Sequence, residues 1–595
     1  MKNKKNEWDL RILTKENFSK KRRIITLKHQ QFINKWQNRQ DWLKNPIVLR
    51  RALDELENLR RFYANGAEEG YYYWLKSEID ENNSEIKAKY NQINNFNLEL
   101  SNQLQFFELN LAHLPKKTQI KFSKSPSLQP YKHFLERLFA QANYLLTDQE
   151  EKIIRLKEQT SHDNWAKMTS GLLSAEKSQV LSENGRPALK SFSEILNLIN
   201  HQNKKVREKA VQALNQILQK NIKIGEQEMN SVLANKKVDD ELRHMDRPDL
   251  ARHLNDDIKS STIDAMIKAV SANFDLSNKY YQLKAKLLKV KKLKYHERNL
   301  AIGKSEIKYS YEKSKQVLQK VLSNLDPELA KIFTNFDKNG AIDVYPRSGK
   351  RSGAFCVAES ISNPTFIMLN HNNRLHGALT LAHEVGHGIN NELMRQKQNA
   401  LNFGTPLSTA EVASTFFEDF ILKEISQEAN DELKLEIMME KLNQDVSTIF
   451  RQTALYQFEQ ELHNEFRIKG YLDSDLIGKL FQKHMSAYMG NYVEQSKGSA
   501  NYWLHWPHIR SFFYVYSYVS GLLISKYLQK KVTKDHKFIE KIKYFLSAGL
   551  SESPQAIFQK LGININDPKF WLEGIREVRD LLTATEKLAK KLKKI

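Results

Sequence analysis

The segment His383 to His387 constrains the fold of this chain more than any other feature of the sequence. It reads His-Glu-Val-Gly-His and follows the largely apolar stretch 379–382. Histidines four residues apart share one face of a helix, so these two imidazoles can bind one metal ion together if the segment is helical. Buried imidazoles without partners would be costly, and a metal ion removes that cost. The spacing therefore predicts a helix that carries a zinc site.

Glu384 stands beside the two histidines, where it can act as a general base on a water at the zinc ion. This combination makes hydrolysis of peptide bonds the first hypothesis. The alternative is coincidence, because a five-residue pattern with three fixed positions arises by chance in about a few per cent of chains of this length. Many such accidents are solvated helix faces, whereas Leu379 and Leu381 precede this motif. The context favours the metal site.

A zinc site of this type needs a third protein ligand. Position 393, where the metzincin class of zinc peptidases has a further histidine, is a leucine, and residues 405–407, about 20 positions downstream, are Thr, Pro and Leu. Glu392 lies too close to His387 on the same helix. Glu411 is therefore the better candidate for the third ligand.

Glu411 also has a purely structural interpretation. Ser408 and Glu411 have the spacing of a capping box at the start of a helix, and Pro406 just upstream fits a helix entry. In the other interpretation, Glu411, Ser414 and Glu418 share one helix face. Glu418 can then accept the free ring N–H of a zinc-binding histidine and orient it, or it is a solvated surface charge. Spacing alone leaves these alternatives open.

The residues of this motif resemble peptidase family M3, most closely its oligoendopeptidase F branch. That family holds zinc with the two histidines of H-E-x-G-H and with the glutamate of an E-x-x-S stretch on the next helix, and both patterns are present here. The resemblance implies that His383, His387 and Glu411 bind one zinc ion per chain. It also implies that Glu384 is the general base. The likeness is strong from about residue 235 to residue 580.

Two further segments carry the resemblance. Residues 342–356 contain Gly-Lys-Arg-Ser-Gly-Ala-Phe, which is similar to a family segment that approaches the substrate backbone. The resemblance therefore implies that Gly353, Ala354 and Phe355 bind substrate. Residues 507–521 are similar to the family's stretch that begins Pro-His-Phe and continues with Phe-Tyr-Val-Tyr.

Tyrosine, tryptophan and histidine are dense in residues 502–518. On periodicity alone, an aromatic helix face packed in a core is the expected explanation. The family resemblance instead implies hydrogen bonds to the substrate and to the oxyanion that forms during hydrolysis. The candidates for this catalytic role are His508, Tyr514, Tyr516 and Tyr518. His505 competes with His508 for the role of the histidine.

One position departs from the family pattern. The family often has a histidine three residues after the second ligand, and this chain has Asn390 there. Because that position is not a zinc ligand, we expect a change in local hydrogen bonding and no loss of activity.

Helix signals dominate the chain. Residues 15–160 and 185–225 have apolar residues at helical spacing. Short strands are predicted at 341–345, 353–357 and 364–370, just before the motif helix. We therefore expect a mostly α fold with a small β-sheet beside the active-site helix, and the edge of that sheet could accept a peptide as an additional strand.

A soft boundary near residue 200 is predicted to separate an N-terminal helical lobe, residues 1–200, from a catalytic domain, residues 201–595. The resemblance implies two helical lobes that enclose a deep substrate channel. Such a channel would exclude folded proteins and would favour short, unstructured peptides.

The formal charge of +23 could attract nucleic acid, anionic lipid or acidic peptides. Lysine is abundant throughout, and no nucleic-acid-binding module is recognisable, so we expect no nucleic-acid partner. The chain has one cysteine, its start lacks the apolar core of a signal peptide, and no apolar stretch reaches the roughly 20 residues of a membrane span. We expect a soluble cytoplasmic protein without membrane contact, either a monomer or a weak oligomer.

The sequence thus predicts a zinc-dependent endopeptidase that cuts internal bonds of short oligopeptides. Two alternatives remain. A related zinc carboxypeptidase would remove one residue from the C-terminus, and a non-catalytic basic helical protein would bind anionic partners. Metal content and the products of peptide turnover distinguish the three.

Overall fold

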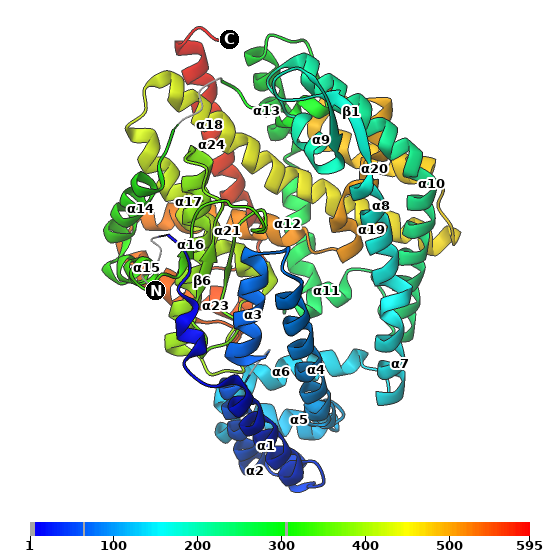
Figure 1. The fold of residues 1–595 in the computed structure, drawn as a ribbon, viewed down its shortest axis with the longest axis vertical. Helices are drawn as coiled ribbons and strands as arrows, with labels where there is room; N and C mark the ends of the chain where they lie inside the picture. The colour runs from blue at the N-terminus through cyan, green and yellow to red at the C-terminus, as the bar shows by residue number, and fades with distance from the viewer. Residues whose placement is uncertain (1–5, 64–65, 304–307) are drawn as a thin grey trace. The chain divides into compact units, whose positions relative to one another are not determined.

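The computed structural model describes residues 6–63, 66–303 and 308–595, and helices dominate it (Figure 1). The chain divides into two compact units. Unit 1 comprises residues 1–143, 306–427 and 528–563, and unit 2 comprises residues 144–305, 428–527 and 564–595. The predicted mostly helical, two-lobed fold is confirmed.

Unit 1 contains the helices α1 (Phe18–Trp36), α2 (Pro46–Phe62), α3 (Ala67–Ile79), α4 (Ser84–Ala112), α5 (Lys116–Ser123), α6 (Lys132–Gln141), α14 (Tyr311–Leu325), α15 (Pro327–Lys338), α16 (Leu375–Lys397), α17 (Leu407–Gln427), α22 (Ile539–Ser547) and α23 (Pro554–Lys560), and the strands β4 (Ile342–Asp343), β5 (Phe355–Val357) and β6 (Phe366–Met368). The helix α21 (Tyr516–Lys534) includes residues of both units.

Unit 2 contains the helices α7 (Asp148–Glu158), α8 (Asn164–Ala175), α9 (Phe192–Leu198), α10 (Lys204–Leu242), α11 (Leu250–Asn255), α12 (Ser260–Ser271), α13 (Phe274–Leu287), α18 (Asp431–Asp445), α19 (Arg451–Lys469), α20 (Ser474–Met489) and α24 (Pro568–Lys591), and the strands β1 (Lys177–Leu181), β2 (Pro187–Ser191), β3 (Leu293–Lys294) and β7 (Val493–Glu494). Two 3₁₀ helices, η9 (Lys497–His505) and η10 (Pro507–Ser511), precede α21.

Each unit is assembled from three separate stretches of the chain. The predicted boundary near residue 200 falls inside unit 2, between α9 and α10, so it does not coincide with a division between the compact units. Within the described part of the chain, none of the helices combines the length and the apolar character that a membrane span requires.

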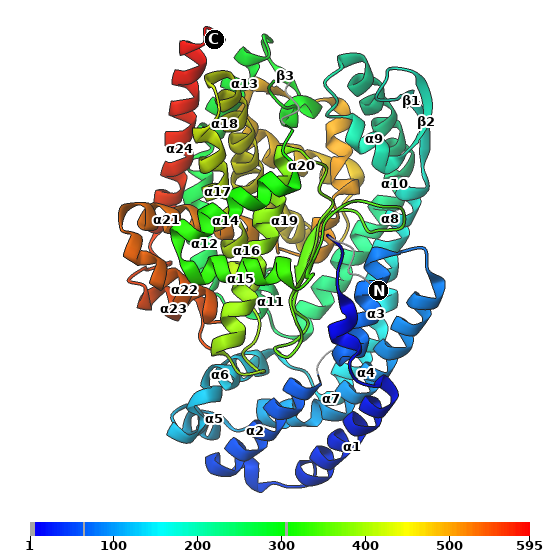
Figure 2. The ribbon, with the colours of Figure 1, turned by 60° about the vertical axis from the view of Figure 1, so that its left-hand side comes forward.

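A three-stranded sheet lies beside α16 in unit 1. Its strand order is β4-β6-β5, with β4 parallel and β5 antiparallel to β6. All three strands fall inside the predicted spans, and β5 and β6 pack against α16, so the predicted small sheet beside the motif helix is confirmed. The helices α14 and α15 also contact α16 (Figure 2). Among the described strands, β5 pairs only with β6 and is an edge of the sheet.

The helical prediction for residues 185–225 is wrong at its start. Residues 187–191 form β2, which pairs antiparallel with β1. Gly185 has a φ of 75° in the connecting turn, and Pro187 has no backbone N–H to donate within a helix. The helix begins only at Phe192, where Ser191 and Glu194 form a capping box.

Local sequence explains why α2 begins and which face it buries. The side chain of Asn45 accepts a hydrogen bond from the backbone N–H of Ile47, and Pro46 takes the first helical position, where its missing N–H costs nothing. Apolar residues then recur at helical spacing and are buried against the core of unit 1. These residues are Leu49, Ala52, Leu53, Leu56 and Leu59.

Trp42 lies at the centre of this N-terminal core. Its side chain is fully buried and stacks on Phe107 of α4, with ring centroids 4.5 Å apart and planes 5° apart. The indole N–H donates to the carbonyl oxygen of Arg39 at 2.8 Å. The ring therefore fills the core without leaving its polar atom unpaired.

Replacement of Trp42 by alanine is expected to lower the free energy of unfolding of this part of unit 1 by about 3–5 kcal/mol, because a large cavity would replace the indole. Urea denaturation followed by far-UV circular dichroism measures the change. Ile47→Ala on the exposed side of α2 is the control and is expected to stay within about 0.5 kcal/mol of the wild type. Equal stability of Trp42→Ala and wild type would contradict this assignment of the core.

Candidate metal centre

Two neighbouring helices of unit 1, α16 and α17, carry the predicted metal ligands (Figure 1). His383 and His387 lie one turn apart on α16, with their ring centroids 5.1 Å apart. Glu411 lies near the start of α17, which begins at Leu407. Since Ser408 is already inside the helix and the Glu411 carboxylate faces both imidazoles, the geometry favours the ligand interpretation of Glu411 over the capping box.

The donor atoms of these three side chains converge. Nε2 of His383 lies 3.4 Å and Nε2 of His387 lies 3.8 Å from Oε2 of Glu411. Donor atoms about 2.0–2.1 Å from a tetrahedral zinc ion lie about 3.3–3.4 Å from one another. Among the described residues this is the one group of three potential ligands whose donor atoms all lie within 4.8 Å of one another. The donor set therefore fits zinc.

The convergent side chains are only partly buried. The exposed fractions are 28% for His383, 23% for His387 and 25% for Glu411. A structural zinc site is closed by four protein ligands, whereas a catalytic site keeps one position for water or substrate. Three ligands with this exposure suit the catalytic type.

Side chains of α17 orient two of the candidate ligands. Nδ1 of His383 lies 3.3 Å from Oε2 of Glu418 and can donate its proton to this carboxylate, so in the neutral ring Nε2 is left to bind a metal ion. Ser414 is fully buried, and its hydroxyl donates to Oε2 of Glu411 at 2.9 Å. Glu418 thus lies where the helical spacing predicted it, two turns after Glu411.

The electrostatics of the cluster favour a bound cation. Burial opposes a charge on His383, but hydrogen bonds with Glu411 and Glu418 raise its pKa to about 10. Burial and the charge on His383 lower the pKa of His387 to about 4. Burial, followed by the effect of the other two carboxylates, raises the pKa of Glu384 to about 7. Acidic groups outnumber charged imidazoles here, and a divalent cation would offset that excess.

Gly386, a residue to which the sequence analysis gave no role, allows α16 and α17 to approach each other. A Cβ atom at this position would lie 2.8 Å from the carbonyl oxygen of Ala413 and 2.8 Å from the Cα atom of Ser414. Such contacts are too short for any side chain, so the helices can pack this closely only at a glycine. The sequence signal for this close packing was the glycine at the fourth position of the motif.

A cavity of about 150 Å³ lies between the predicted substrate segment and the first turns of α16. Gly353 and Ala354 line it on one side, and His376 and Thr380 line it on the other. His376 and Thr380 precede His383 at helical spacing, so the cavity follows the face of α16 that carries the ligands.

The third predicted substrate residue has a different environment. The ring of Phe355 packs against Trp74 and Trp8, with centroids 5.2 Å and 6.1 Å away. Asn370, which the sequence analysis missed, donates to the carbonyl oxygen of Gly353 at 2.7 Å and so holds the substrate segment in place. No local sequence pattern marks Asn370, because its partner Gly353 precedes β5 whereas Asn370 follows β6.

Three of the four candidate donors form one aromatic cluster in unit 2. The rings of His508 and Tyr514 are stacked, with centroids 5.4 Å apart and planes 7° apart. Tyr518 meets both rings edge-on, at 6.3 Å and 5.7 Å. All three side chains are partly exposed, so their polar atoms can reach a ligand.

Tyr516 and His505 are placed differently. Tyr516 is fully buried, and its hydroxyl donates to Oδ2 of Asp256 at 2.6 Å. His505 packs against Tyr502 and Phe192, and its Nε2 atom is buried without a hydrogen-bond partner among the described residues. The burial of this ring nitrogen favours His508 over His505.

Asn390, the departure from the family pattern, is buried and hydrogen-bonded. Its amide donates to the carbonyl oxygen of Leu546 in α22, and its side-chain oxygen accepts from Thr405 at 3.2 Å. The residue thus connects α16 to α22.

Sequence comparisons match most of this chain to known peptidases. Residues 188–577 match the sequence model of peptidase family M3, and residues 110–176 match a model described as oligopeptidase F. Oligopeptidase PepF of Bacillus subtilis is 23% identical over 545 residues, which are 89% of this chain and 79% of the relative. An oligoendopeptidase F homolog of Borreliella burgdorferi is 24% identical over 578 residues, which are 95% of each chain.

Solved structures share the fold. A peptidase from Chlamydophila abortus aligns with a TM-score of 0.85 at 20% identity and covers 98% of both chains. Oligoendopeptidase-F from Enterococcus faecium aligns with a TM-score of 0.71 at 18% identity, over 96% of this chain and 99% of that one.

Gly386→Ala is expected to weaken zinc binding by about 10–100-fold, a loss typical of disturbed ligand orientation, because its Cβ would push α16 away from α17. Zinc titration against a competing chelator measures the affinity. Gly171→Ala is the matched control, since a Cβ on this α8 residue meets no atom within 4 Å. Unchanged zinc affinity in Gly386→Ala would show that the helix spacing does not set the site.

Proposed function

This chain belongs to peptidase family M3 and is a metallo-oligopeptidase, and we propose that it uses one zinc ion, held by His383, His387 and Glu411, to cut internal bonds of short, unstructured peptides. The observation that carries the proposal is the convergence of these three donor sets within 4.8 Å on two packed helices. Glu384 lies beside them on α16 and is almost fully buried.

The chemistry divides between the metal and the protein. When bound, zinc would supply a Lewis acid that polarises the peptide carbonyl and lowers the pKa of the attacking water. Glu384 accepts the proton of that water and then delivers it to the leaving amine. Glu418 holds the proton on Nδ1 of His383, so this ring keeps its coordinating orientation through the reaction.

We propose that the substrate is recognised mainly through its backbone. Gly353 has a φ of 86° and open space where a Cβ would stand, so a peptide can approach the main chain here. The segment leads into β5, the edge strand of the small sheet, and an extended peptide can pair with such an edge. Recognition of this kind restricts the length and conformation of the substrate more than the identity of its side chains.

We also propose that His508 and Tyr514 donate hydrogen bonds to the carbonyl oxygen as it gains negative charge. The support is the resemblance of residues 507–521 to the family segment and the exposed, stacked arrangement of the two rings. Tyr518 joins the same cluster. Because the hydroxyl of Tyr516 already donates to a buried aspartate, a supporting role suits that residue better.

We infer a cytoplasmic location, a monomeric or weakly oligomeric state, and no nucleic-acid partner. The single cysteine suits a reducing compartment. The charge of +23 is spread over many lysines rather than gathered in a recognisable nucleic-acid-binding module.

Glu384→Gln is expected to retain zinc and to lose about 10²–10⁴-fold in kcat, because glutamine keeps the shape but cannot take a proton. Elemental analysis measures the metal, and hydrolysis of a quenched fluorescent peptide measures the rate. Glu392→Gln on the same helix, outside the ligand cluster, serves as the control and is expected to stay within about twofold of wild type. Hydrolysis by Glu384→Gln at the wild-type rate would sink the assignment of the base.

Product masses distinguish an endopeptidase from the related carboxypeptidase. Incubation of a defined mixture of short peptides is expected to give internal cuts that stop with a chelator and return with added zinc. Mass spectrometry of the products reads the cleavage positions directly. Products shortened by one C-terminal residue at a time would instead establish the carboxypeptidase. A folded, zinc-loaded protein that cuts no peptide would favour a binding protein.

A further inference from the structure

The chain between His508 and Tyr514 makes a strained turn, here called the 511–513 turn. Phe512 and Phe513 both have left-handed backbone angles, with φ of 44° and 59°. Residues other than glycine adopt this conformation at a cost in free energy and keep it only where surrounding contacts enforce it. The contacts of the turn therefore identify what holds His508 and Tyr514 in their stacked arrangement.

Two polar side chains, from α19 and α11, hold the backbone of the turn. Oε2 of Glu459 in α19 accepts a hydrogen bond from the backbone N–H of Phe513 at 2.7 Å. The guanidinium of Arg252 in α11 donates to the carbonyl oxygens of Ser511 and Phe512, at 3.1 Å and 3.3 Å. Three consecutive residues are thus each fixed through a main-chain polar atom.

One face of α19 supports the two phenylalanine rings. The ring of His463 lies 5.4 Å from that of Phe512 and 4.8 Å from that of Phe513, measured between centroids. The ring of Tyr456 lies 5.6 Å from that of Phe513. Tyr456, Glu459 and His463 recur at helical spacing, so all three face the turn together.

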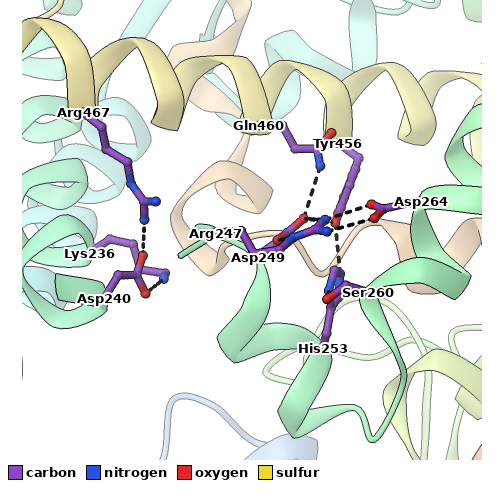
Figure 3. Close-up of polar contacts among 10 residues, drawn as sticks. All are labelled: Lys236, Asp240, Arg247, Asp249, His253, Ser260, Asp264, Tyr456, Gln460 and Arg467. Carbon is purple, nitrogen blue, oxygen red and sulfur yellow. Dashed lines mark hydrogen bonds and ion pairs between the residues drawn. The ribbon is translucent and has the colours of Figure 1, made fainter. Parts of the chain in front are cut away.

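Hydrogen bonds drawn in Figure 3 fix this face of α19 to α11 and its neighbours. The hydroxyl of Tyr456 donates to Asp249 at 2.6 Å and accepts from Nε2 of His253 at 3.0 Å. Gln460 also donates to Asp249, at 3.2 Å, and Arg247 forms an ion pair with it. The support of the turn is therefore itself buried and hydrogen-bonded.

Polar and charged side chains also contact the residues that flank the turn. After it, Tyr516 donates to Asp256, whose carboxylate lies 3.8 Å from the guanidinium of Arg252. On the other side, the ammonium of Lys236, drawn with its partner Asp240 in Figure 3, lies 6.0 Å from the centroid of the Phe512 ring. Tyr516 thus anchors the segment that carries Tyr514.

The contacts of Glu459 indicate no role other than holding this turn. It is fully buried, so it cannot touch a substrate, and its Oε1 atom has no hydrogen-bond partner among the described residues. Burial raises its pKa to about 8. Burial of a carboxyl group costs free energy unless hydrogen bonds compensate for the lost contact with water. The hydrogen bond that compensates here is the one to the turn.

We propose that Glu459 and Arg252 are positioning residues, which force the 511–513 turn into its left-handed conformation and thereby stack His508 on Tyr514 as one pair of hydrogen-bond donors. This inference rests on the proposed function for its effect on catalysis. The stacking itself is independent of that function.

Paired variants of the full chain test the catalytic consequence. Glu459→Gln keeps an oxygen acceptor for the N–H of Phe513, and Glu459→Leu removes it at similar volume. With a fluorescent peptide and zinc-loaded protein, Glu459→Leu is expected to lower kcat about 10–100-fold, since small misplacements of catalytic groups have effects of this size. KM and zinc content are expected to stay within about threefold of wild type. Glu459→Gln is expected to recover most of kcat.

A matched control separates positioning from general damage. Glu461→Leu removes a carboxylate from the same helix, where it pairs with Lys483 and His484 and does not touch the turn, and it is expected to leave kcat unchanged. If Glu459→Leu does not fold, Arg252→Met replaces it, because Arg252 is partly exposed. Wild-type kcat in the folded variant, or a loss in Glu459→Gln equal to that in Glu459→Leu, would overturn the proposal.

A spectroscopic measurement tests the stacking without any activity. Histidine labelled with ¹³C in the ring is incorporated, and the signal of His508 is assigned by its loss in His508→Asn. The face of the Tyr514 ring is expected to shift this signal upfield in wild type and in Glu459→Gln, and the shift is expected to disappear in Glu459→Leu. If the upfield shift of the wild type persists in both Glu459→Leu and Glu459→Gln, the inference is refuted. Absence of peptide hydrolysis by wild type, with the shifts as expected, refutes only the proposed function.

Discussion

The distance between α16 and α17 is the constraint on which the rest of the candidate metal centre depends. Metal ligands tolerate errors of only a few tenths of an ångström, and the donor atoms here come from two different helices. Gly386 lets the backbone of Ala413 and Ser414 come within the space that a side chain would fill. At this distance the carboxylates of Glu411 and Glu418 reach opposite nitrogen atoms of the His383 ring. A single missing methyl group thus sets the geometry of the ligand and of the residue that orients it.

The part of the site that lies on α16, with His383, Glu384 and His387, could be predicted from sequence. Helical periodicity fixes which residues of one helix share a face. The third ligand was harder, since Glu411 has the spacing of both a capping residue and a ligand. Only the packing of α17 against α16 distinguishes the two, and no pattern within one helix contains that information. Asn370 acts through a contact with another segment, which periodicity does not reveal, and Gly386 was marked only by its place in the motif.

The aromatic segment shows a second limit. Tyr514, Tyr516 and Tyr518 alternate in the sequence, and no helical or strand period indicates which of them is exposed. The left-handed residues Phe512 and Phe513 break the regular period just before them. The groups that stabilise this conformation come from other helices. Arg252 of α11 lies 260 positions before Phe512, and Glu459 of α19 lies 54 positions before Phe513. In the same way, Gly185 and Pro187 interrupted a predicted helix through backbone restrictions that an apolar pattern does not record.

The composition of unit 1 from three stretches of the chain has a consequence for its synthesis. Asn390 of the ligand helix donates to the carbonyl oxygen of Leu546, and α22, which contains Leu546, belongs to the last stretch of the unit. A ribosome releases residues 383–411 well before residues 539–547. The helix that carries the two candidate histidine ligands therefore remains without this support until most of the chain has emerged.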